Sequence, residues 1–178
     1  MTPAVALLRA VNVGGRAVLA MDDLRRIAAA IGLDGPRTYL QSGNLVFAVA
    51  GADAAGVAPR LEGAIATELG VETTVIVRSR AELAAVAAAH PFSTGGIDPR
   101  LLHVVFLTGR PQPDRVAALD PDRSPPDAFL VDGSHVYVAY PNGSGRSKLN
   151  LDYFERRLGV AGTARNWNTV GNLLAMMG

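Results

Sequence analysis

The sequence contains no cysteine. A chain without thiols forms no disulfides, holds no thiolate-bound zinc or iron–sulfur cluster, and has no cysteine nucleophile. Long apolar runs are missing too, because no stretch approaches the roughly 18–20 apolar residues that span a bilayer. The apolar opening segment is interrupted by Arg9 and follows no basic residue, which does not fit a signal peptide. The sequence therefore predicts a cytoplasmic protein that does not associate with membranes.

An excess of charge of either sign is also missing. The 178 residues include 17 basic and 16 acidic side chains, which leaves a net charge of +1. Proteins that coat nucleic acid by bulk charge need many Lys and Arg side chains against the phosphates, so this class is excluded, although a local basic site is not. With 49% hydrophobic residues the chain is long enough to bury a core, which excludes intrinsic disorder.

The sequence contains few residue patterns that could bind a metal ion or act as an acid–base pair. The three histidines, His90, His103 and His135, have no HxxxH or HExxH spacing, so we expect no metal site, and no cofactor motif is present. Asp120 and Asp127 belong to a Pro-rich segment, where we interpret the aspartates as solvated turn residues.

The first half of the chain alternates between strand and helix patterns. The segment 37–49 carries β-rich residues on both sides of Ser42-Gly43 and predicts a hairpin. Asp22 is an expected helix N-cap, and Gly32 and Gly70 are expected helix ends. Strands are expected over 5–13, the two arms of 37–49, and 73–77, and helices over 22–31 and 55–69.

The second half repeats this pattern after a linker. Pro91 ends an Ala-rich helix, and the loop-forming segment 93–96 follows it. Ser147 is the expected cap of a helix that ends at Gly159, and Asn166 or Asn168 that of the last helix. The other elements expected here are helix 82–89, strand 101–107, helix 114–119 and hairpin 129–140. We expect a first unit over 1–79, a connecting helix and linker over 80–99, and a second unit over 100–178.

The two halves resemble each other at residue level. Segment 7–16, LLRAVNVGGR, aligns with segment 101–110, LLHVVFLTGR, with five identities in ten positions. This similarity predicts an internal duplication. The expected fold is α+β, with two ferredoxin-like (split βαβ) units, each an antiparallel sheet with helices on one face.

This topology brings two polar loops together. The loop after the first strand and the hairpin at 41–44 lie at the same end of such a sheet, so Asn12 and Arg16 should lie beside Gln41, Ser42 and Asn44. The alternative is that these are turn residues that bond to their own backbone. Arg9 should point, by strand alternation, to the same side as the neighbouring valines, where it would need polar partners.

Two further motifs suit an anion. The segment 141–149, PNGSGRSKL, follows a strand and precedes a helix, and it contains Arg146 and Lys148, the only lysine. Its glycines and helix start favour phosphate binding, although it lacks the Gly-Lys-Ser/Thr order of a P-loop, and a solvated capped loop is the alternative. The segment 165–169, RNWNT, offers a guanidinium, amides and the only Trp, which could stack on a planar ligand or simply cap and fill the fold.

Together, LRAVNVGG at 8–15, RTYLQSGNLVF at 37–47, SKL at 147–149 and RNWNT at 165–169 resemble the bacterial family of domain of unknown function 1697. The resemblance covers almost the whole chain and implies a fold and a bacterial origin, but no reaction. The sequence has Ala10 where the family commonly has glycine, which suggests only that no ligand needs a bare backbone there.

Three functional hypotheses stay open. The first is binding of a phosphate-bearing ligand, a nucleotide or short nucleic acid, at an Arg- and Asn-rich groove. The second is a thiol- and metal-independent transferase or hydrolase with Lys148 or Ser42 as the reacting group, and the third is a structural or interaction module, for example a homodimer. The candidate ligand-binding residues are Asn12, Arg16, Arg37, Gln41, Ser42, Asn44, Arg146, Lys148, Arg165, Asn166, Trp167 and Asn168.

Overall fold

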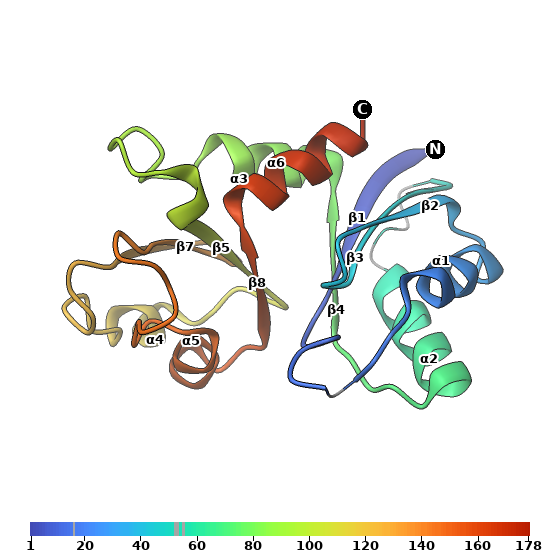
Figure 1. Cartoon of the computed structure of the whole chain (residues 1–178), viewed down its shortest axis with the longest axis horizontal. Coiled ribbons are helices and arrows are strands. Elements are labelled where there is room, and N and C mark those ends of the chain that lie inside the picture. Colours follow the sequence, from blue (N-terminus) through green and yellow to red (C-terminus); the bar gives the residue numbers. More distant parts are fainter. Residues whose placement is uncertain (16, 52–53, 55) are drawn as a thin grey trace. The chain divides into compact units, whose positions relative to one another are not determined.

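The computed structural model describes residues 1–15, 17–51, 54 and 56–178. The chain forms two compact units, one of Met1–Ala85 with Asn172–Gly178 and one of Val86–Gly171. Two helices, α3 (Arg80–Ala88) and α6 (Trp167–Met176), contribute residues to both units (Figure 1). Among the described residues, no helix is both long and apolar enough to cross a membrane.

The first unit is a four-stranded antiparallel sheet in the order β2-β3-β1-β4. Its elements are β1 (Thr2–Leu8), α1 (Met21–Ala30), β2 (Asp34–Tyr39), β3 (Asn44–Val49), α2 (Val57–Leu69) and β4 (Val75–Ser79). Helices α1 and α2 lie on one face of the sheet (Figure 1). Because the order of elements is strand, helix, strand, strand, helix, strand, this is the ferredoxin-like arrangement.

The core of this unit lies between the sheet and its two helices. Strand β1 places Ala4, Ala6 and Leu8 on this face, and Leu24 and Leu61 meet them from the helices. All five side chains are buried, and burial of a leucine is worth about 1.5–3 kcal/mol. Val5 and Leu7, which alternate with these residues, are buried as well, so both faces of β1 are covered and Ala4, Ala6 and Leu8 mark the face under the helices.

Strand β1 ends at Leu8, which is shorter than the expected 5–13 strand. Ala10 and Asn12 both have a φ of 56°, a left-handed conformation that stops a strand. This conformation favours glycine and accounts for the glycine common at position 10 in the family that the sequence resembles. Arg9 follows the strand end, where its N–H donates to the Thr74 carbonyl and its carbonyl accepts from the Thr73 hydroxyl, while the direction of its side chain stays a prediction.

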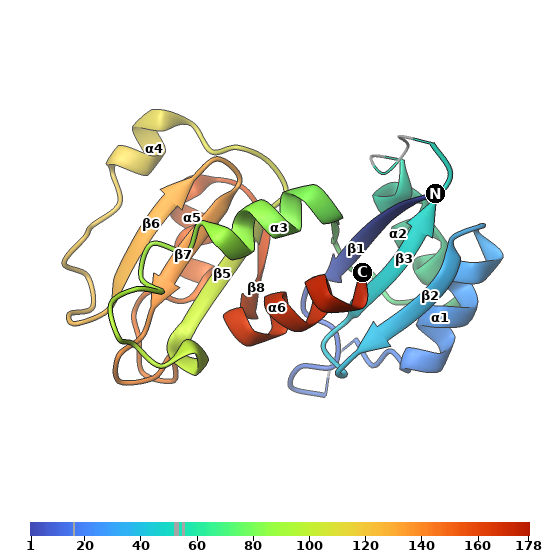
Figure 2. The ribbon, with the colours of Figure 1, turned by 90° about the horizontal axis from the view of Figure 1, so that it is seen from above.

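The second unit has the same topology, with sheet order β6-β7-β5-β8 (Figure 2). Its elements are the 3-10 helix η1 (Pro99–Leu101), β5 (Leu102–Leu107), α4 (Pro113–Ala117), β6 (Ala128–Asp132), β7 (His135–Ala139), α5 (Leu151–Leu158) and β8 (Gly162–Asn166). Val105, Leu107 and Val138 pack under Phe154 of α5 in a core of their own. The predicted duplicated α+β fold is confirmed.

Three expectations about the helices and strands differ from the structure. Helix α5 is capped by Asn150, whose Oδ1 accepts from the Tyr153 N–H at 2.9 Å, and not by Ser147. Helix α1 begins after Ala20 with no side-chain cap, and Asp22 lies in its first turn. Strand β8, which the sequence analysis did not predict, completes the sheet by pairing with β5.

Candidate functional site

The loop after β1 and the β2–β3 hairpin meet at one end of the first sheet, as expected. The side-chain amide of Asn12 donates to the carbonyl of Gln41 at 2.7 Å and to that of Leu19 at 2.8 Å. Its Oδ1 accepts from the Leu19 N–H at 2.8 Å. Asn12 therefore uses its whole amide to hold the loop and the hairpin together.

The hairpin residues bond to one another in the same way. Asn44 is fully buried, and its amide donates to the Tyr39 carbonyl and to the Ser42 Oγ, both at 2.9 Å. On the other face of the sheet, Arg37 of β2 donates to the carbonyl of Met176 at the end of α6. Arg16 lies outside the described residues. The ligand-binding role of these residues stays a prediction, since the hydrogen bonds found are internal ones.

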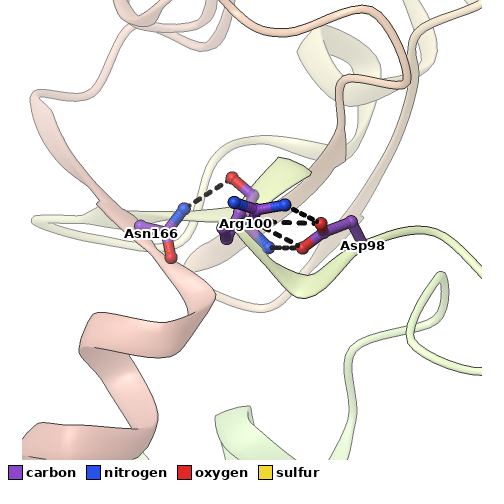
Figure 3. A network of polar contacts seen from close by, with 3 residues as sticks. All are labelled: Asp98, Arg100 and Asn166. Carbon is purple, nitrogen blue, oxygen red and sulfur yellow. Dashed lines mark hydrogen bonds and ion pairs between the residues drawn. The ribbon is translucent and has the colours of Figure 1, made fainter.

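The RNWNT segment forms the end of β8 and the start of α6. The Asn166 amide donates to the Arg100 carbonyl at 2.8 Å, and its Oδ1 accepts from the Asn168 N–H at 2.9 Å, so Asn166 caps the helix. Figure 3 shows Asn166 beside Arg100, whose guanidinium pairs with Asp98. Asn168 is exposed at the first turn.

Arg165 is buried on β8, and its guanidinium donates to the Thr163 Oγ1 at 2.7 Å and to the Ala164 carbonyl at 2.9 Å. Burial lowers the pKa of Arg165 to about 10, because removal from water disfavours the charged form. A guanidinium with a pKa near this value stays charged at neutral pH. Arg165 is thus a buried cation tied to its own strand.

Trp167 belongs to an aromatic cluster around the buried His90. The His90 ring centroid lies 5.4 Å from that of Trp167 and 5.2 Å from that of Tyr137. The Phe92 N–H donates to His90 Nδ1 at 3.4 Å, and Nε2 lies 3.2 Å from the His103 carbonyl. This arrangement fits a neutral imidazole with its proton on Nε2.

We expect the protein to lose stability in mild acid through this cluster. Burial lowers the pKa of His90, and also that of His103. A depressed histidine pKa stabilises the fold above the unfolded value of about 6.5, and the stabilisation declines as pH falls through the folded pKa. Urea unfolding followed by Trp167 emission should give a lower free energy of unfolding at pH 5 than at pH 7.5. His90→Gln should flatten this profile, and an unchanged profile in the variant would remove His90 as a cause.

The loop from Pro141 to Leu149 is held by hydrogen bonds near its two ends. At its start the Gly143 N–H donates to the Tyr140 carbonyl at 2.8 Å. At its end the Ser124 Oγ accepts from the Lys148 N–H at 3.1 Å, and the Leu149 carbonyl accepts from the Tyr140 hydroxyl at 2.7 Å. Burial, and then the charge of Asp127, raises the pKa of Tyr140 to about 12, so this hydroxyl keeps its proton.

The middle of the loop carries N–H groups that make no hydrogen bond to any described residue. Within the part of the chain that the structure describes, the N–H groups of Ser144, Gly145 and Arg146 donate no hydrogen bond. The exposed side chains of Arg146 and Lys148 have neither a hydrogen bond nor an ion pair to any described residue. Consecutive N–H groups and nearby cations are the groups that hold anions in proteins.

A cavity of about 560 Å³ opens beside this loop. Asn142, Gly143, Gly145, Arg146 and Ser147 of the loop line one wall, and Ser124, Pro125, Pro126 and Asp127 line the other. Ser144 and Lys148 of the loop are not part of the lining. A cavity of similar size in the first unit, about 460 Å³, is lined mainly by apolar groups such as Met176 and Met177. No group of His, Asp and Glu side chains that could hold a metal ion occurs among the described residues.

Sequence reasoning found one wall of this cavity and missed the other. Asp127 was interpreted as a solvated turn residue, but it is half-buried and its Oδ2 accepts from the Ser124 Oγ at 3.0 Å. The sequence signal was the Ser-Pro-Pro-Asp run, whose prolines restrict the backbone. Nothing local in it indicates contact with a loop more than ten residues away.

One comparison with known proteins identifies the fold, and another identifies the family. A conserved bacterial protein from Streptococcus pneumoniae, SP0830, has a solved structure that matches 99% of each chain with a TM-score of 0.77 and 21% identity. No curated protein matches the sequence. The model of the family described as a protein of unknown function, DUF1697, matches residues 1–137. The chain therefore belongs to the DUF1697 family of proteins of unknown function.

Proposed function

We propose that this protein binds the phosphate group of a small phosphorylated ligand in the cavity beside the loop 141–149. The observation that supports it best is the pair of consecutive N–H donors of Gly145 and Arg146, two residues that line the cavity, from which no described residue accepts. Phosphate oxygens accept hydrogen bonds from such groups, and the Arg146 guanidinium adds a planar pair of donors. The exposed ammonium of Lys148 adds a second positive charge nearby.

The size of the cavity favours a small ligand over a nucleic acid. Cavities that hold small ligands are typically about 300–1,000 Å³, and this one is about 560 Å³. Nucleic acid binding relies on many phosphate contacts along a basic surface. The net charge of +1 does not supply such a surface, so an oligonucleotide serves as a comparison ligand in the test.

Arg146→Ala should weaken binding without affecting the fold. A charge-assisted hydrogen bond contributes about 1.5–3 kcal/mol, so we expect the Kd for ribose 5-phosphate to rise roughly 10–100-fold. Isothermal titration calorimetry of the wild type and the variant measures this change. Because Arg146 is exposed, the melting temperature should stay within about one degree.

The matched control for this experiment is Arg110→Ala. Arg110 is an exposed arginine of the same unit that does not line the cavity, so its loss removes the same charge from elsewhere. Equal losses of affinity in both variants would point to a general charge effect and contradict the proposed site. Tighter binding of a short oligonucleotide than of any mononucleotide would favour a nucleic-acid ligand instead.

A structural role for the motifs of the first unit is the second candidate. It is favoured by the hydrogen bonds of Asn12 and Asn44, whose amides bond to groups of the same two loops. In this interpretation these motifs set the loop geometry, and the ligand binds in the second unit.

A further inference from the structure

We propose, building on the phosphate site above, that Asp127 makes the cavity selective for phosphorylated ligands that also carry hydroxyl groups. Asp127 lines the same cavity as the loop 141–149, together with Ser124 and the two prolines that precede it in sequence. It is half-buried, unlike the exposed Asp120 and Asp122 of the same segment. Its carboxylate is therefore part of the cavity lining and not a solvated surface group.

The Asp127 carboxylate is held in place by Ser124, which also contacts the end of the loop 141–149. The Asp127 Oδ2 accepts from the Ser124 Oγ at 3.0 Å, and the same Ser124 Oγ accepts from the Lys148 N–H at 3.1 Å. The Asp127 N–H also donates to the Ser124 carbonyl at 2.8 Å. Ser124 thus links the carboxylate to the end of the phosphate loop, which fixes the two walls relative to each other.

One oxygen of this carboxylate is free for a ligand. Among the described residues, no group donates to the Asp127 Oδ1. An ionised carboxylate only accepts hydrogen bonds, so its natural ligand partner is a hydroxyl or an N–H. Inorganic phosphate keeps a P–OH group at neutral pH, but its net negative charge would be repelled by the carboxylate. The cavity thus combines the N–H donors of the loop 141–149 with the Asp127 carboxylate as an acceptor. This combination fits a ligand that has an anionic group at one end and hydroxyl groups at the other.

Sugar phosphates and ribonucleotides have this chemistry. Their phosphate would meet the N–H groups of Gly145 and Arg146, and their hydroxyls would donate to Asp127. Acidic side chains accept from a ribose hydroxyl in dinucleotide-binding folds, which shows that a carboxylate can recognise this group. We therefore expect the ligand to be a phosphorylated sugar, and the ligands below distinguish a free sugar phosphate from a nucleotide.

The test compares four ligands by calorimetry on the full chain. They are ribose 5-phosphate, its 1,2,3-trideoxy analogue (tetrahydrofurfuryl phosphate), which has no ring hydroxyl, inorganic phosphate and adenosine 5′-monophosphate. We expect the wild type to bind ribose 5-phosphate at least about tenfold more tightly than the trideoxy analogue, as for a hydrogen bond to a charged group. Tighter binding of the monophosphate nucleotide would support the proposal with a nucleotide as the source of the sugar.

Asp127→Asn should abolish this preference. The amide keeps an oxygen for Ser124 but removes the negative charge, so the ratio of the two Kd values should fall to within about threefold, while phosphate binds as well or better. Asp127→Glu, which keeps the charge but moves it by one methylene, should also lose the preference. Asp122→Asn removes an exposed carboxylate outside the cavity and should leave the ratio unchanged.

The outcomes separate this proposal from the one on which it rests. If the wild type binds the trideoxy analogue as tightly as ribose 5-phosphate, selection by Asp127 is overturned and phosphate binding stands. If the wild type binds none of the four ligands at millimolar concentration, both proposals fail. If both Asp127 variants keep the tenfold preference, another group recognises the sugar and the assignment to Asp127 is wrong.

Discussion

Replacement of Gly43 by alanine should destabilise the first unit by about 3 kcal/mol or more. The new Cβ would lie 2.6 Å from Cγ2 of Val11 and 2.7 Å from Cβ of Leu8. Both neighbours are buried, and the Leu8 N–H donates to the Gly43 carbonyl at 2.8 Å, so neither side can withdraw without breaking the sheet end. Gly43 also has a φ of +75°, which costs a residue with a side chain about 1–2 kcal/mol.

The effect is measured as the free energy of unfolding in urea and as the melting temperature. A loss of about 3 kcal/mol corresponds to roughly 6–12 °C in a chain of this length. Gly70→Ala is the matched control, because Gly70 has a φ of +65° but nothing within 4 Å of the added carbon. It should show the conformational cost alone, and equal losses in the two variants would contradict the steric argument.

The fold was predictable because its signals are local and repeated. The signals are the continuous apolar runs of β1 and β5, the hairpin turns at Ser42-Gly43 and Gly133-Ser134, and the Gly70 helix end, and each lies within a short window of sequence. Strand β8 carried no such signal. Its sequence, GTARN, has one β-branched residue, and it becomes a strand because Thr163 pairs with Phe106 of the neighbouring β5.

The N-cap of helix α5 also depends on a contact that the local sequence does not reveal. Ser147 and Asn150 are both good N-cap residues, and the sequence does not distinguish them. In the structure the Ser147 Oγ accepts from the Leu149 N–H at 3.0 Å, while the Lys148 N–H bonds to Ser124. This holds the backbone in a turn until Asn150, so the cap is decided by a contact with a segment distant in sequence.

Some residues of the candidate site could be predicted from the sequence and others could not. Arg146 and Lys148 were identifiable, because a Gly-rich loop with basic residues before a helix is a recognisable pattern. Ser124 and Asp127 were not, because their importance depends on where β6 lies beside β7 and not on their own neighbours in sequence. Asn12 and Asn44 were identified as important polar residues, but their partners proved to be backbone carbonyls and a serine.

Replacement of Asn12 by alanine should lower the free energy of unfolding by about 2–4 kcal/mol. The change removes three hydrogen bonds, two to the carbonyls of Leu19 and Gln41 and one from the Leu19 N–H. Each is worth about 0.5–1.5 kcal/mol, and the carbonyl groups left behind lose their partner. Asn12 also has a φ of 56°, which asparagine tolerates better than alanine does.

Asn168→Ala is the contrasting variant, since sequence alone suggested the same packing role for both residues. The Asn168 side chain is exposed and makes no hydrogen bond within the described part of the chain, so this change should shift stability by less than about 0.5 kcal/mol. Asn12→Asp keeps the acceptor for Leu19 but turns an oxygen toward two carbonyls, so it should be no better than alanine. Urea unfolding of all three variants measures these differences. A stable Asn12→Asp protein would show that the two carbonyl contacts do not hold the loop.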